Sequence, residues 1–500
     1  MYTPRGAGVS ELGDIEIVAA GDGLHLFHLT LPNHDVIQHA VSQDGLSWHP
    51  LPAALRTGDP GSCDDDQIWT MSVTPRPRPR DGYVMLYTAL STTDDGRVQR
   101  IAMATSNDLV HWTKSPSSPV AFADHRWYEA TPGDVSAVSF RDPKPVRVGE
   151  EYFATVCARE NAGPLSRRGC VALLRSTDLE TWDVLPPLFA PRHYWDLECP
   201  QLFQLGGGRS PAPWYLTAAI MEDRSQRYWV ADEPTGPFRI PPDGDVLAPA
   251  GHYASRVARW HDMDLLFAWH QPNLAKGWQT TPATVDWTSI RNPFGKFLAP
   301  PLLLTSRDDS SLALRSFPGW RDRLGPWEIA GAESSAQGAI NATSHSGMTS
   351  ATSRPPTDGF MVEGILRLGG ARGGLVFRSD GEGGGLVLEL NANSRVVQLQ
   401  RWARRRDMYG AATGPAFEII QTADHHTPIR ADAEIPVRVV AAGPYLEVSL
   451  DDEVVIAIMT GTPPHGDWGI WVEDGECVMQ AARIAPLRRP GEDIPRAHRT

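Results

Sequence analysis

Short apolar stretches run through the first 300 residues in pairs, each pair separated by a turn that contains glycine or aspartate. The paired stretches are 14–18 with 24–27, 67–73 with 83–87, 141–146 with 151–154, 198–203 with 214–216, and 252–257 with 265–269. Runs this short, bounded by turn residues and rich in β-branched and aromatic side chains, indicate β-strands. The pattern therefore predicts five similar units, which begin near residues 14, 67, 141, 198 and 252.

A seven-residue motif, S-x-D-x-x-x-W, recurs late in three of these units. It occupies 42–48, 106–112 and 176–182, so that its tryptophans are 64 and 70 residues apart. The motif predicts a tight turn that closes a strand pair, with the tryptophan packed between sheets. A period of about 55 to 75 residues suits a four-stranded sheet with one long loop, and five such sheets arranged radially form a five-bladed β-propeller.

The remainder of the chain shows a second all-β pattern. Strand-like stretches occur at 374–377, 386–390, 446–450 and 469–472, separated by glycine-rich turns. This arrangement is typical of a β-sandwich. We therefore expect an all-β protein with a propeller catalytic domain over 1–305, a connector over 306–358 that is rich in small polar residues, and a sandwich over 359–500.

Composition narrows the function classes. The 500 residues carry 46 basic and 60 acidic side chains, a net charge of −14, so a nucleic-acid partner is not expected. No run of 18 apolar residues and no leader pattern at the N-terminus is visible, so we expect a cytoplasmic protein without a membrane partner, although a mature secreted form would look the same. The five cysteines follow no metal or redox spacing, and we expect no metal and no cofactor. The oligomeric state stays open.

Acidic residues stand at the start of three of the five first strands. These strands would line the central funnel, where Asp14, Asp142 and Glu198 would occupy equivalent positions and converge with Trp69, Thr70 and Tyr253. Converging carboxylates oppose folding through repulsion and desolvation, so their grouping favours a function over a structural role. Two carboxyls in a pocket lined with aromatic residues can perform glycoside hydrolysis.

Several segments resemble motifs of glycoside hydrolase family 32, which contains invertases, inulinases, levanases and related fructosyltransferases. Phe140-Arg141-Asp142-Pro143 is similar to its R-D-P motif, and 195–203 (WDLECPQLF) to its W-x-E-C-P-D-L-F segment. The stretches 253–255 (YAS), 266–269 (LFAW) and 68–73 (IWTMSV) resemble further motifs of the family. Asp14 lies eleven residues before His25-Leu26-Phe27, close to the spacing of the family's first aspartate.

The resemblance implies a role for each acid. Asp14 would be the nucleophile, Glu198 the general acid and then base, and Asp142, beside Arg141, would bind sugar hydroxyls and stabilise the transition state. Further substrate-binding candidates are Trp69, Thr70, Cys199, Trp195, Tyr253 and Trp269. The family retains configuration, which predicts a gap of about 5–5.5 Å between the Asp14 and Glu198 carboxyls. The implied substrates are oligo- or polysaccharides with β-fructofuranosyl units, such as sucrose, levan or inulin.

The first motif departs from the family pattern W-M-N-D-P-N-G, because residues 11–17 read ELGDIEI and lack its tryptophan and first asparagine. Glu16 could offer the sugar a new polar contact, or it could be a solvent-facing strand residue. Three other functions stay open. They are a fructosyltransferase, including an intramolecular one, an inverting arabinofuranosidase or xylosidase with a carboxyl gap of about 6.5–9.5 Å, and a carbohydrate-binding protein that has lost catalysis.

Overall fold

A computed structural model describes residues 2, 11–76, 81–134, 136–206, 212–248, 251–270, 297–330, 338–370, 372–381, 384–392, 394–406, 412–460 and 465–488. The chain divides into two compact units, Met1–Ala313 and Leu314–Thr500. Both units are built from β-strands, as the sequence predicts. Within the described ranges, no helix is both long and apolar enough to cross a membrane.

The N-terminal unit contains five separate antiparallel sheets; the first four follow the chain order, and in the fifth β18 pairs with both β19 and β20. The first two are β1 (Glu11–Ala20), β2 (Gly23–Leu31), β3 (Val36–Ser42), β4 (His49–Arg56), and β5 (Gln67–Pro75), β6 (Tyr83–Leu90), β7 (Arg100–Ser106), β8 (Thr113–Lys114). The next two are β9 (Phe140–Val148), β10 (Glu151–Arg159), β11 (Gly169–Ser176), β12 (Asp183–Phe189), and β13 (Glu198–Phe203), β14 (Trp214–Ala219), β15 (Gln226–Ala231), β16 (Val246–Ala248). The fifth is β17 (His252–Trp260), β18 (Met263–His270), β19 (Phe297–Leu298), β20 (Leu302–Ser306) and β21 (Leu312–Arg315).

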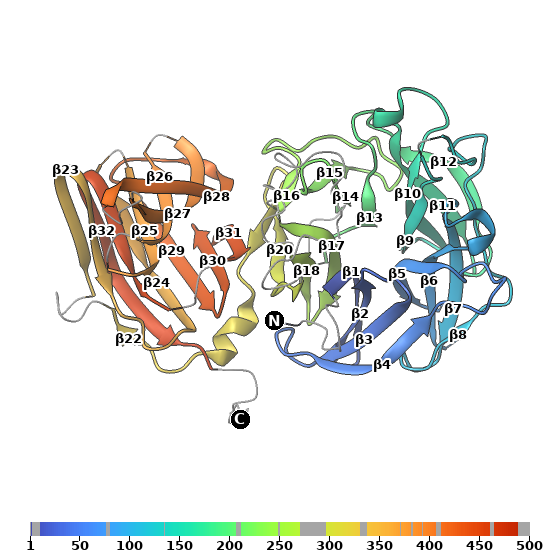
Figure 1. Cartoon of the computed structure of the whole chain (residues 1–500), viewed down its shortest axis with the longest axis horizontal. Coiled ribbons are helices and arrows are strands. Elements are labelled where there is room, and N and C mark those ends of the chain that lie inside the picture. Colours follow the sequence, from blue (N-terminus) through green and yellow to red (C-terminus); the bar gives the residue numbers. More distant parts are fainter. Residues whose placement is uncertain are drawn as a thin grey trace. The chain divides into compact units, whose positions relative to one another are not determined.

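The five sheets are the blades of a propeller. Each first strand contacts the first strand of the next blade, from β1 through β5, β9 and β13 to β17, and β17 in turn contacts β1. Figure 1 shows these strands innermost, with the other strands of each blade outside them. The ring also closes near the chain start, where the Leu298 amide donates to the Tyr2 carbonyl over 3.0 Å. The predicted five-bladed propeller is confirmed.

The repeated motif forms the turn between the third and fourth strands of the first three blades. In the second blade the Asp108 carboxylate accepts hydrogen bonds from the amides of Val110 and His111, while the Ser106 hydroxyl accepts from the Leu109 amide. Leu109 has a φ of +67°. The Trp112 ring then packs edge-on against Phe27 of the first blade, with 5.7 Å between ring centroids. The predicted turn and packing of the tryptophan between sheets are therefore present.

The C-terminal unit is one eleven-stranded sheet that folds over its own core as a sandwich. Its strands are β22 (Glu328–Ile329), β23 (Ile340–Ser353), β24 (Phe360–Leu368), β25 (Arg372–Ser379), β26 (Gly385–Asn391), β27 (Ser394–Arg406), β28 (Ala412–Ile429), β29 (Glu434–Ala442), β30 (Tyr445–Leu450), β31 (Glu453–Met459) and β32 (Asp467–Pro486). The long β32 pairs with β25 through its first half and with β24 through its second half. Apolar side chains from both layers, such as Leu388, Val448 and Ile470, form one core.

The predicted connector over 306–358 contains regular structure. It includes β21, the 3-10 helix η3 (Pro318–Arg323), β22 and β23. Both β22 and β23 pair with β32, and Ile340 and Ala342 are buried in the C-terminal core. The small polar residues of this segment resemble those of a linker, although the segment forms strands. The reason is that β23 alternates buried with exposed side chains only at its start and is exposed along most of the rest.

Candidate active site

The first strand of every blade is distorted at the same place. One extra residue is inserted relative to the second strand between Leu12 and Ile15, Trp69 and Met71, Arg141 and Lys144, Glu198 and Gln201, and Tyr253 and Arg256. Within these bulges Asp142, Cys199 and Ala254 have φ values of +62°, +48° and +49°. Bulges beside active sites redirect side chains, and such backbone conformations persist only where the surrounding structure fixes them.

The three acids are staggered within this repeated bulge. Glu198 lies one position before it, Asp142 is its first residue and Asp14 is its second. The expectation that all three occupy equivalent positions is therefore wrong by one residue in each direction.

Asp14 of β1 accepts hydrogen bonds from three other blades. The Thr70 hydroxyl donates to its Oδ2, the Cys199 thiol donates to the same oxygen over 3.6 Å, and the Trp269 indole N–H donates to Oδ1 over 3.1 Å. The side chain keeps partial exposure to solvent. These contacts fix the orientation of the carboxylate and leave it accessible, as a nucleophile requires.

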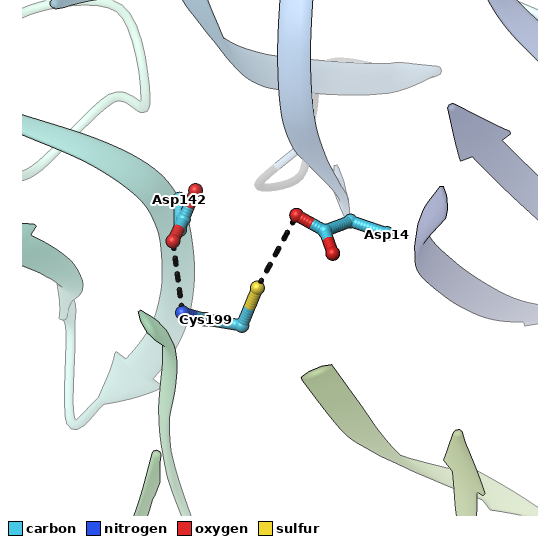
Figure 2. Close-up of side chains that lie close together, drawn as sticks. All are labelled: Asp14, Asp142 and Cys199. Atoms are coloured by element: carbon cyan, nitrogen blue, oxygen red, sulfur yellow. Dashed lines mark hydrogen bonds between the residues drawn. The ribbon is translucent and has the colours of Figure 1, made fainter. Parts of the chain in front are cut away.

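Asp142 and Cys199 form the next part of the site. Figure 2 shows Cys199 between the two aspartates, its amide directed to Asp142 and its sulfur to Asp14. The amide N–H donates to Asp142 Oδ2 over 2.9 Å, and the Asp142 amide donates to the Thr88 hydroxyl over 3.0 Å. Burial raises the pKa of the Asp142 carboxyl, while the nearby Arg141 guanidinium opposes this shift. The thiol therefore touches the predicted nucleophile.

Glu198 is held from two sides. The Arg141 guanidinium donates to Oε1 over 2.8 Å, and the Tyr253 hydroxyl donates to Oε2. Burial and the adjacent Glu198 charge raise the pKa of the Tyr253 hydroxyl well above its ordinary value, so this tyrosine remains a donor. The carboxyl is 18% exposed, which makes it reachable from solvent.

A charged network that the sequence did not reveal supports Arg141. The Arg141 guanidinium also binds Asp196 over 2.8 Å, and Asp196 accepts two hydrogen bonds from Arg159. All three side chains are buried. Asp196 lies two residues before Glu198 in the segment 195–203, and this position was the one sequence signal that could have indicated it. Arg159 lies outside the motifs described above.

Two aromatic residues connect the carboxylates. Tyr253 and Trp269 face each other across β17 and β18, with ring centroids 5.7 Å apart and planes nearly perpendicular. Tyr253 binds Glu198 and Trp269 binds Asp14, so this pair separates the two carboxylates. An arginine that the sequence did not indicate, Arg224, lies over the Tyr253 ring at 4.9 Å.

Three predicted site residues have other surroundings. Trp69 is half-buried, bonds Gln67 through its indole N–H over 2.7 Å and lies 5.4 Å from the His34 ring. Trp195 is half-buried with the Arg159 guanidinium 4.5 Å from its ring centre, and so reaches the acids through the charged network. Glu16 is fully buried and pairs with Lys144 over 2.5 Å, which excludes the solvent-facing alternative.

Asp14, Asp142 and Cys199 each offer one possible metal-ligand atom, and these atoms lie within 4.8 Å of one another. Burial and both carboxylates raise the pKa of the Cys199 thiol well above its ordinary value. The neutral thiol donates to Asp14.

The sequence of the N-terminal unit matches the family model described as "Glycosyl hydrolases family 32 N-terminal domain" over residues 17–290. The chain belongs to glycosyl hydrolase family 32. The resemblance inferred from the motifs is confirmed.

Known members of family 32 are similar to this chain over part of their length. An insoluble β-fructofuranosidase isoenzyme of Arabidopsis thaliana is 32% identical over 181 residues, which cover 34% of this chain and 28% of that protein. Fructan 1-exohydrolase w2 of Triticum aestivum is 30% identical over 186 residues, 36% of this chain and 28% of the relative. The alignments thus span under a third of these relatives.

The fold of family 32 extends over both units. The crystal structure of fructan 1-exohydrolase IIa from Cichorium intybus covers 98% of this chain and 97% of its own, with a TM-score of 0.67 and 15% sequence identity. At this identity the likeness shows the fold. Asp142 and Glu198 lie inside the matched family 32 region, but Asp14 precedes it, so Asp14 is placed in the site by its three hydrogen bonds.

Proposed function

We propose that this protein is a retaining glycoside hydrolase that cleaves β-fructofuranosides by double displacement. The observation that carries the proposal is that two differently held carboxyls, Asp14 and Glu198, are linked through the Tyr253–Trp269 pair. The names of the relatives support the substrate class, since they include a β-fructofuranosidase and fructan 1-exohydrolases. Retention is what membership of family 32 implies, and it corresponds to a gap of about 5–5.5 Å between the Asp14 and Glu198 carboxyls.

In the first step an Asp14 oxygen attacks the anomeric carbon of the fructosyl unit. The bond from that carbon to the glycosidic oxygen breaks, and Glu198 transfers its proton to the departing oxygen. Thr70, Cys199 and Trp269 hold Asp14 in one orientation, so that little conformational freedom is lost on reaching the transition state.

In the second step Glu198 acts as a base. It removes a proton from water, the water oxygen bonds to the anomeric carbon, and the ester bond to Asp14 breaks. Arg141 and Tyr253 stabilise the Glu198 carboxylate that receives this proton. Arg141 also bonds Asp196 and approaches Asp142, so its charge is shared among three carboxylates.

Asp142 would bind sugar hydroxyls. Its Oδ2 accepts from the Cys199 amide, while within the described part of the chain no protein donor reaches Oδ1. The carboxylate at this position would also stabilise the positive charge that develops on the fructosyl ring in the transition state. The nearby Arg141, at 3.5 Å, favours the ionised form that this role requires.

The proposal is tested by a product screen with sucrose, levan, inulin and aryl furanosides, followed by NMR of the first anomer released. We expect fructose release with retained configuration. Hydrolysis of an arabinofuranoside or xyloside with inversion would contradict the proposal, and binding without turnover would favour a carbohydrate-binding protein. Appearance of new fructosyl linkages in place of free fructose would identify a transferase.

A further inference from the structure

A buried charged cluster links the first strands of all five blades. Glu16 of β1 accepts a hydrogen bond from Lys144 of β9 over 2.5 Å and another from the Val73 amide of β5 over 3.3 Å. Its second oxygen lies 3.6 Å from Nε of Arg256 on β17. We call Glu16, Lys144 and Arg256 the axial triad. Its side chains are 1%, 12% and 1% exposed, so it lies inside the propeller.

Arg256 connects this triad to β13, the first strand of the fourth blade and the remaining one of the five. Its Nη1 donates to the carbonyl oxygens of Cys199 over 3.1 Å and Pro200 over 3.3 Å. These two residues form the β13 bulge, and Cys199 has the positive φ noted above. A planar guanidinium with a fixed fork of donors can hold two carbonyls at once, which a lysine ammonium does with less directional control.

The same bulge carries the donors that touch two of the acids. Its Cys199 amide binds Asp142, and its Cys199 thiol binds Asp14. The residue directly before the bulge is Glu198. A shift of this bulge would therefore displace contacts to all three acids together, although Arg256 itself contacts none of them in the described structure.

We propose that Arg256, anchored by Glu16, is a positioning residue for the reaction, and that it acts by fixing the Cys199–Pro200 bulge. The expected effect of Arg256 on kcat rests on the proposed function. Buried charges are costly unless they are paired and hydrogen-bonded, so a triad with one negative and two positive members is a costly arrangement for stability alone. The Arg256 charge is partly offset by Asp142, whose pKa it lowers.

The test compares Arg256→Met and Arg256→Lys with the wild type, with Arg259→Met as the matched control on the same strand. Arg259 is 45% exposed and pairs with Asp262 outside the triad. We expect Arg256→Met to lower kcat about 100-fold, with KM changed less than about threefold, because misplacement of catalytic groups costs rate more than binding. Arg256→Lys should lose about tenfold in kcat, and Arg259→Met should behave as wild type.

The pH profile adds a readout that a merely structural role would not move. The groups that face Arg256 are Glu16, Lys144, Cys199 and Asp142, and the Arg256 charge lowers the pKa of the Asp142 carboxyl. Arg256→Met should therefore shift the acidic limb of kcat/KM to higher pH, whereas Arg256→Lys, which keeps the charge, should leave the limb in place.

A second measurement separates this proposal from the proposed function. Cys199 is 2% exposed, and we expect iodoacetamide to alkylate it at least about tenfold faster in Arg256→Met than in wild type under native conditions, because the bulge opens. Failure of the wild type to cleave fructofuranosides would overturn only the function. A folded Arg256→Met with wild-type kcat, pH profile and alkylation rate would overturn the positioning role. If Arg256→Met does not fold, a wild-type kcat in Arg256→Lys would overturn the positioning role.

Discussion

Asp142 in the N-terminal unit and Glu447 in the C-terminal unit are both buried carboxyls whose pKa is raised by desolvation. Glu447 is bonded by Ser316 and by Tyr445, which lies two residues away on the same strand. Asp142 instead has positive φ and is fixed by groups from two other blades, Thr88 and Cys199. A buried carboxyl is thus common to both units. The site differs because its acid residue has positive φ and is bonded by residues of two other blades.

Replacing the nucleophile should have the largest effect. We expect Asp14→Asn to abolish turnover and any covalent intermediate, since the amide cannot form the glycosyl ester. The matched control from the other unit is Glu447→Gln, which keeps an acceptor oxygen for one of the two hydroxyls, Ser316 or Tyr445, and offers an NH2 donor to the other, and should leave kcat within about twofold. Comparable losses in both variants, measured as initial rates on sucrose or inulin, would remove the distinction between the two regions.

Glu198→Gln should lower kcat by about 10²–10⁴-fold, the usual contribution of general acid–base catalysis. Sugar binding should persist, because the amide oxygen can still accept from Arg141 while the amide NH2 group can donate to the Tyr253 hydroxyl oxygen. Steady-state kinetics and isothermal titration with fructose check the two halves of this expectation. Loss of binding together with activity would assign Glu198 to substrate recognition instead.

Thr70→Val should have an intermediate effect. The change preserves shape but removes the hydroxyl that donates to Asp14. A hydrogen bond to a charged group contributes about 1.5–3 kcal/mol, so kcat/KM should fall about 10- to 150-fold. Thr357→Val in the C-terminal unit is a suitable comparison, since its hydroxyl bonds the Gly359 carbonyl. An equal loss in both would show that the Asp14 contact has no special weight.

The smallest effect concerns stability in acid. Burial lowers the pKa of His28 and of His252 to about 4, against about 6.5 in the unfolded chain. The unfolded state therefore binds protons first, and stability falls as pH drops from about 6.5 to 4, by up to about 3 kcal/mol for each histidine.

The two units should differ in this acid response. Three carboxyls carry the opposite sign because their folded pKa is raised, namely Asp142 and Asp264 in the N-terminal unit and Glu447 in the C-terminal unit. The N-terminal unit also holds two further histidines whose pKa burial lowers, His39 and His270. The histidines therefore make the N-terminal unit the first to open in acid. Hydrogen exchange between pH 7 and 4.5 measures this, and His252→Leu should flatten the pH dependence; earlier opening of the C-terminal unit would contradict it.

Much of the fold could be predicted from the sequence because its signals are local. The turn motif and the paired strands revealed five blades, and the R-D-P and E-C-P segments located Asp142 and Glu198. Asp14 was located by its strand and by its distance from His25, and the structure joins it to the other acids. Each of these signals is carried by residues that are close together in the chain, which is the range over which a single sequence is informative.

The missed features depend on residues far apart in the chain. Glu16 was weighed as a sugar contact or a surface residue, but its partner Lys144 lies 128 residues away. The one-residue stagger of the acids arises from bulges that alternation alone does not show. The segment before β24 resembles a linker in composition, yet β23 gains its place from pairing with β32. Such pairings are decided by tertiary structure and carry no local sequence signal.

The central claim is that Asp14 forms a covalent bond with the substrate while Glu198 supplies the proton. Its most direct test is to react the Glu198→Gln variant with an aryl β-fructofuranoside that bears a good leaving group, quench with acid and locate the adduct by peptide mass spectrometry. The account predicts a fructosyl adduct on Asp14, because the leaving group no longer needs the acid and the base for hydrolysis is absent. An adduct on another residue, or inverted product without any adduct, would contradict it.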